Sequence, residues 1–223
     1  MRMKRKIVLI SVAILVLICA FACLASCNKD KNKEQSDNVS RLTEAYYAGE
    51  SSSFAVSVEK GRREKNFIAD GTATDVVDFC EINIQPLKTN EYEKITYVLS
   101  GQDKTLSGEL TGGTFGEFTA SIALDFVPDK ITVTAVKEQS EIDLSSVLEG
   151  ALTSQDVINI AKKEFKEKID AEYSEGKADR EIYVKLITAD RTNYYYYVSF
   201  IGDGTDYWAM LVDIKTGAIV SKK

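Results

Sequence analysis

Hydrophobic and polar residues alternate along much of the chain between residues 53 and 136. Phe54, Val56 and Val58 are separated by small or polar residues, and the same pattern returns in several later runs. A period of two residues is typical of strands that bury one face. Glycine or proline residues interrupt the runs at the intervals expected for turns. The pattern predicts an antiparallel sandwich or barrel of about six or seven strands.

The pattern changes to a helical period after residue 150. Thr153 and Asp156 have the spacing of a capping box, in which a hydroxyl and a carboxylate bind backbone N–H groups at the start of a helix. The apolar residues that follow recur at spacings of three and four, which places them on one side of a helix. They are Val157, Ile160, Ala161, Phe165 and Ile169. We therefore predict an amphipathic helix that packs on a sheet.

Strand-like runs follow this helix and would supply its sheet. They cover residues 181–188, 193–201 and 207–214, with a short return at 218–221. Together the two patterns predict an α+β fold class. An N-terminal all-β sandwich-like module would be followed by a module in which one helix packs on an antiparallel sheet.

Shifts in composition divide the chain further. Between Asn28 and Ser40 almost every residue is polar, so this segment cannot bury enough apolar surface to fold and is expected to be a flexible stalk. A short helix or turn is expected at 41–47. The predicted organisation is a leader (1–26), a polar stalk (27–45), a β-rich domain (46–138), a linker (139–151) and a second domain (152–223).

The tetrapeptide Leu24-Ala25-Ser26-Cys27 ends the apolar leader and resembles the lipobox of bacterial lipoproteins. The resemblance implies that residues 1–26 are a signal peptide, that Cys27 is lipidated and that the peptide is cut just before it. Four basic residues near the start place the rest of the chain on the extracytoplasmic face of the cell membrane. An uncleaved transmembrane helix over residues 7–26 is the alternative.

Charge and residue usage exclude several classes of function. Residues 1–26 contain four of the 28 basic residues and none of the 34 acidic ones, so the segment after residue 26 has a net charge of −10. This charge argues against nucleic-acid binding. Histidine is absent, which excludes Ser-His-Asp and Cys-His catalysis and the common zinc sites. Cys80 lies in a strand-like run and is expected to be buried and inert. We predict a protein that is not an enzyme, with no catalytic residue, no cofactor and no metal site.

The last third of the chain resembles the PepSY domain. A capped amphipathic helix is followed by a strand and by a tyrosine-rich strand, as in that family. Near the end of the chain, Asp213, Thr216 and Gly217 occupy the positions of the Asp and the Thr-Gly pair in the family's motif. The resemblance implies a PepSY-like domain over residues 152–223. It also implies peptidase inhibition or regulation, or protein binding outside the cytoplasm, with no catalytic residues to transfer. From the residues alone, Asp213, Thr216 and Gly217 are expected to form a structural turn.

Four successive tyrosines, Tyr194, Tyr195, Tyr196 and Tyr197, would lie in one strand and point in pairs to its two faces. With Trp208 they form a candidate binding surface, because exposed aromatic residues are enriched at interfaces. One hypothesis is a membrane-anchored, non-catalytic protein-binding lipoprotein whose partner is an extracytoplasmic peptidase. The alternative is a carbohydrate or cell-wall binding lipoprotein that uses the same surface. A purely structural role, with one pair in the core and the other shielded by neighbouring strands, also stays open.

Overall fold

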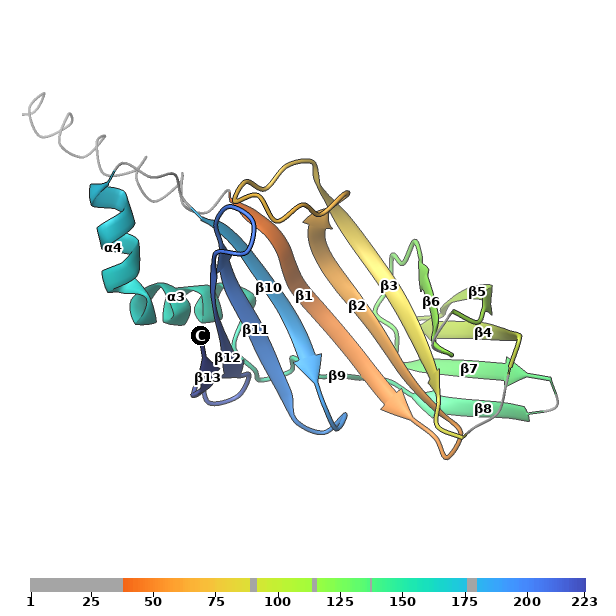
Figure 1. Cartoon of the computed structure of the whole chain (residues 1–223). Helices are drawn as coiled ribbons and strands as arrows, with labels where there is room; N and C mark the ends of the chain where they lie inside the picture. Colours follow the sequence, from red (N-terminus) through yellow and green to blue (C-terminus); the bar gives the residue numbers. More distant parts are fainter. Residues whose placement is uncertain (1–37, 89–91, 114–115, 137, 176–179) are drawn as a thin grey trace, which may run out of the picture. The chain divides into compact units, whose positions relative to one another are not determined.

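The computed structural model describes residues 38–88, 92–113, 116–136, 138–175 and 180–223 (Figure 1). Of these residues, 54% lie in strands and 11% in helices. The strands form two sheets.

The larger sheet has nine strands and draws them from both halves of the described chain. They are β1 (Val39–Glu50), β2 (Phe54–Glu64), β3 (Val76–Pro86), β6 (Phe118–Ser121), β9 (Ser145–Ser146), β10 (Glu181–Thr188), β11 (Tyr194–Ile201), β12 (Tyr207–Asp213) and β13 (Ile219–Lys222). Their order is β13-β12-β11-β10-β1-β2-β3-β6, and β9 pairs with β1 outside this path. All neighbours are antiparallel except β1 and β10, which run parallel.

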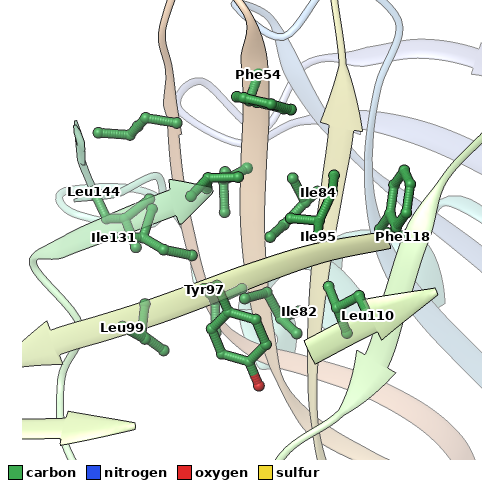
Figure 2. Close-up of a cluster of buried hydrophobic side chains, with 14 of the residues drawn as sticks. Phe54, Ile82, Ile84, Ile95, Tyr97, Leu99, Leu110, Phe118, Ile131 and Leu144 are labelled. Carbon is green, nitrogen blue, oxygen red and sulfur yellow. The ribbon is translucent and has the colours of Figure 1, made fainter. Parts of the chain in front are cut away.

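The smaller sheet has four antiparallel strands in the order β5-β4-β7-β8. They are β4 (Lys94–Gly101), β5 (Lys104–Thr111), β7 (Lys130–Ala135) and β8 (Glu138–Asp143). This sheet packs on β2 and β3, and side chains from both sheets interdigitate between them (Figure 2). Val58 and Ile82 from the larger sheet and Leu99 and Ile131 from the smaller one are fully buried. Each such side chain contributes about 1.5–3 kcal/mol of burial free energy.

Two short helices, α3 (Ser154–Glu164) and α4 (Lys166–Ser174), follow the smaller sheet in sequence. The predicted capping box is confirmed: the Thr153 hydroxyl accepts from the backbone of Asp156, and the Asp156 carboxylate accepts from the backbone of Thr153. Apolar residues of α3 and the following Phe165 form a second core with β10, β11 and β12. Its most deeply buried members are Val157, Ala161, Val184, Tyr196, Val198 and Val212.

Both cores lie on the same side of the larger sheet. Directly opposed residues on neighbouring strands share a face, and Arg41 of β1 is opposed by Tyr183 of β10 and by Arg63 of β2. Successive residues of a strand point to opposite faces, so Tyr183 points away from its neighbour Val184 and from the helix core. In β2, Arg63 follows Val58 by an odd number of residues, so the two side chains point to opposite faces. Arg63 therefore points away from the core between the sheets. We call the side that carries Arg41, Arg63 and Tyr183 the open face.

Thr43 lies where β1 meets three other elements. Its hydroxyl accepts a hydrogen bond from the backbone N–H of Leu186 in β10 (3.2 Å) and donates one to Glu59 in β2 (2.7 Å). Its carbonyl oxygen accepts a hydrogen bond from the hydroxyl of Ser154, in the first turn of α3. The pairing of β1 with β2 shifts register directly after Thr43. Beyond this bulge, the edge of β1 that faced β10 pairs with β9 instead.

The predicted α+β fold class is wrong, because the described chain is mostly β. Residues 39–50, which begin inside the predicted stalk (27–45) and include the expected helix or turn at 41–47, form a 12-residue strand. This strand joins the predicted sandwich-like module and the predicted PepSY-like module in one sheet. Polar and apolar residues do not alternate regularly in this strand, so its sequence shows no clear period of two. The domain boundaries at 46–138, 139–151 and 152–223 stay predictions.

Replacing Thr43 by valine should destabilise the protein, because the change keeps the side-chain shape but removes the hydroxyl and leaves the Leu186 N–H without its acceptor. We expect the free energy of unfolding to fall by about 1–3 kcal/mol, measured by urea unfolding of residues 28–223. Thr132→Val, on the smaller sheet, is the control and should change it by no more than about 0.5 kcal/mol. Equal effects of the two substitutions would contradict the role given to Thr43.

Candidate binding site

Two ion pairs lie side by side on the open face of β1, β2 and β3. The Arg41 guanidinium lies 2.9 Å from both carboxylate oxygens of Glu59, and about nine-tenths of each side chain is buried. Arg63 binds Glu81 at 3.0 Å. The ring of Phe79 lies between the two arginines, whose guanidinium carbons are 4.8 Å and 4.6 Å from its centroid. These four charges therefore find their partners within the protein.

An aromatic group continues the open face onto β10 and β11. The ring of Tyr183 lies 5.9 Å from the Arg41 guanidinium, 6.3 Å from the ring of Tyr197 and 5.4 Å from the ring of Phe67. Tyr195 is on the same face, two residues before Tyr197, and both are half-buried. Tyrosine combines a large apolar ring with a polar hydroxyl, which suits a surface that contacts a partner.

A groove of about 610 Å³ lies beside these residues, between β10 and the first three strands. The hydroxyphenyl rings of Tyr46 and Tyr194, with centroids 5.8 Å apart, form part of its wall. Arg191, which lines the groove, binds Glu50 at 3.2 Å. This volume is within the range of sites that bind small molecules or a short piece of a larger partner.

Lys185 lines the same groove and is half-buried. Its opposed residue on β11 is Tyr197. No carboxylate of the described residues lies within 4.0 Å of its ammonium group, because Glu59 and Glu81 in the same groove bind Arg41 and Arg63. Among the described residues, Lys185 is therefore the charged side chain of the groove that has no ion-pair partner.

The residues of the predicted aromatic surface do not share one face. Tyr195 and Tyr197 lie on the open face, whereas Tyr194, Tyr196 and Trp208 pack with the helix core. Tyr196 is fully buried, and its hydroxyl donates a hydrogen bond to a backbone carbonyl at 3.2 Å.

Trp208 is held by neighbours on its own side of the sheet. The Arg180 guanidinium lies 3.9 Å from the centroid of its ring, and the ring of Phe165 lies at 5.8 Å. Arg180 is itself fixed by ion pairs with Glu172 and Asp206, each at 2.5 Å. Trp208 therefore has a packing role, and its ring is not free to stack on a ligand.

Asp213 ends β12, and Thr216 and Gly217 lie in the connection to β13. The Asp213 carboxylate accepts hydrogen bonds from the backbone N–H groups of Lys215 (3.0 Å) and Thr216 (2.7 Å) and from the Thr216 hydroxyl (2.8 Å). These bonds, those from Thr216 first, lower the pKa of Asp213. Gly217 has a φ of 71°, which favours glycine.

The predicted lipidation site, Cys27, lies outside the described residues. Cys80 is buried in β3, and burial raises the pKa of its thiol to about 11. A thiol with this pKa is a poor nucleophile at neutral pH, because it is the thiolate that reacts.

Sequence reasoning did not single out Lys185, Arg41 or Tyr183. One signal was present, because the strand predicted at 181–188 alternates, placing Tyr183 and Lys185 together on the face opposite Ile182 and Val184. The groove itself gave no local signal, because residues from six strands, β1, β2, β3, β9, β10 and β11, line it.

Comparisons of the chain with protein-family models, with curated proteins and with solved structures find no match. In the part of the chain that the structure describes, no group of three or more acidic, cysteine or histidine side chains is placed to hold a metal ion. Nor does any helix there have the length and apolar character needed to cross a membrane. The functional argument therefore depends on the open face and its groove.

A buried carboxylate lies at the start of β10. Glu181 is fully buried, with the Ser40 hydroxyl and the Gly71 backbone beside it. Burial raises the pKa of this carboxyl group, and the charges of Glu64 and Asp70 raise it further. The group therefore keeps its proton to a higher pH than an exposed glutamate does.

Glu181→Gln should become progressively more stable than the natural protein as pH rises. A carboxyl group whose folded pKa lies above its ordinary value of 4.5 contributes stability that is complete below that value and is lost as pH rises through the folded pKa. Glutamine does not ionise, so the variant avoids this loss. Urea unfolding at pH 4.5 and pH 7.5 measures the difference, with Glu149→Gln at an exposed position as the control. The same pH dependence in both variants would contradict the assignment.

Proposed function

We propose that this protein is a membrane-anchored extracytoplasmic lipoprotein that works as a non-catalytic protein-binding module. Its binding surface is the open face, with the groove that contains Lys185. The observation that carries the proposal is this combination of half-buried tyrosines and an unpaired cation on a sheet face that neither core covers.

Several features of the open face favour binding over catalysis. Tyrosine and arginine are enriched at protein interfaces, and Tyr183, Tyr195 and Tyr197 lie together here. The carboxylates that could act as acid or base, Glu59 and Glu81, are held in ion pairs. The chain has no histidine to activate a nucleophile.

The resemblance of residues 152–223 to the PepSY domain supports an extracytoplasmic peptidase as the class of partner. The alternative, binding of carbohydrate or cell wall, depended on a tyrosine and tryptophan surface. The position of Trp208 beneath Arg180 weakens that alternative, although Tyr195 and Tyr197 remain available to a sugar.

Replacing Cys27 by serine should abolish lipidation, because serine has no thiol to carry diacylglycerol. We expect the variant to lose incorporation of a labelled fatty acid in the source cells and to keep residues 1–26, since the leader is cut only before the lipidated cysteine. Intact mass of the protein measures both changes, and Cys80→Ser is the matched control that should stay labelled and lack residues 1–26. A natural protein that carries no label and keeps residues 1–26 would favour an uncleaved helix over residues 7–26.

A photo-crosslinking amino acid placed at Tyr195 should capture a protein partner in intact cells. The same amino acid at Tyr173, which is 59% exposed on α4, should capture none, because α4 lies on the opposite side of the sheet. Tyr197→Ser should lower the yield at Tyr195 by about tenfold or more if Tyr197 is a central contact. Mass spectrometry identifies the captured protein.

Two results would overturn this proposal. Equal capture from Tyr195 and Tyr173 would show that the open face is not the binding surface. Capture of cell-wall material alone, together with sedimentation of the purified protein with insoluble peptidoglycan, would favour the wall-binding alternative.

A further inference from the structure

The strand β10 has an open edge inside the groove. It pairs with β1 only as far as Leu42 opposite Val184, because the edge of β1 then passes to β9. From Lys185 to Thr188, no strand of the described residues pairs with the side of β10 that faces β1, and the gap there is lined by Tyr46, Ser145 and Val147. In Figure 1, β10 and β1 diverge towards their C-terminal ends.

The backbone groups on this edge follow from the pairing with β11. The N–H of Leu186 points towards β1, because it donates to the Thr43 hydroxyl. In an antiparallel pair, alternate residues direct both their N–H and C=O to the same side. The N–H and C=O of Thr188 therefore also face the groove, as does the C=O of Leu186.

Lys185 stands at the start of this open edge and adds a charge to it. Lys185 is half-buried, and its ammonium group has no acidic partner among the described residues. The three carboxylates that line the groove, those of Glu50, Glu59 and Glu81, each bind an arginine. An ammonium group and a carboxylate form a charge-assisted hydrogen bond, which is stronger than a bond between neutral groups. The edge offers backbone hydrogen bonds to an extended chain, and the lysine offers an ion pair to an acidic side chain.

We propose that the groove receives an extended, acidic segment of the partner protein, which adds as a strand to the Lys185–Thr188 edge of β10 and places a carboxylate on Lys185. This inference rests on the proposed protein-binding function and specifies the kind of partner segment. Addition of a strand to an open edge gains affinity from main-chain hydrogen bonds and specificity from side chains.

The test is a selection of nine-residue peptides from a random library on the purified chain of residues 28–223. We expect the selected peptides to share one Asp or Glu at a fixed position. The best peptide should bind Lys185→Gln at least tenfold more weakly, and its Asn or Gln analogue should bind the natural protein as weakly. Lys163→Gln, the same charge change on exposed α3, is the control and should bind the peptide as the natural protein does. In an added strand only every second N–H of the peptide faces β10. Methylation of these nitrogens should abolish binding, and methylation of the nitrogens between them should not.

The outcomes separate this inference from the function on which it rests. Peptides without an acidic position, peptides with equal affinity for the natural protein and Lys185→Gln, or tolerance of every N-methylation would each overturn the inference. If the Tyr195 crosslink to a protein persists in such a case, the binding function stands without it. Loss of that crosslink on adding the selected peptide in excess would place the partner in the same groove.

Discussion

One edge of β1 serves two partners in succession, first β10 and then β9. The bulge after Thr43 allows this change, because it bends the strand at the point where the Thr43 hydroxyl takes over from backbone pairing and caps the Leu186 N–H. Ser154 fixes the start of α3 to the same residue. The parallel pairing that joins the two halves of the sheet is only a few residues long, so side-chain hydrogen bonds around Thr43 reinforce it.

The open face follows from this geometry. Because β10 leaves β1, the sheet opens into a groove and exposes a short strand edge within it. The Arg41–Glu59 pair beside the groove is buried, so loss of either partner would leave an uncompensated charge there. Phe79 and Tyr183 shield the pair from water. The other charged side chains of the groove are thus paired locally, whereas Lys185 has no acidic partner among the described residues.

The local parts of the fold were predictable from the sequence, and the long-range parts were not. The strands expected at 181–188 and 193–201 match β10 and β11 to within a residue, because both runs are rich in aromatic and β-branched residues. Alternation also predicted two tyrosines on each face of β11. It could not place Trp208, whose face is set by its pairing opposite Phe200 on the helix side. The strand β1 was missed because Arg41 and Thr43 are polar residues whose partners lie on β2 and β10.

Electrostatics act at two ranges in the proposed complex. The segment after residue 26 has a net charge of −10, so an acidic partner is repelled at distances up to about one Debye length, roughly 8 Å at physiological salt. Lys185 attracts a carboxylate most strongly at short range, where the two groups can form a charge-assisted hydrogen bond. Recognition then depends on an extended segment that can reach the edge of β10, and an acidic surface alone does not suffice. Partners would therefore be selected by the shape of the segment first and by its charge second.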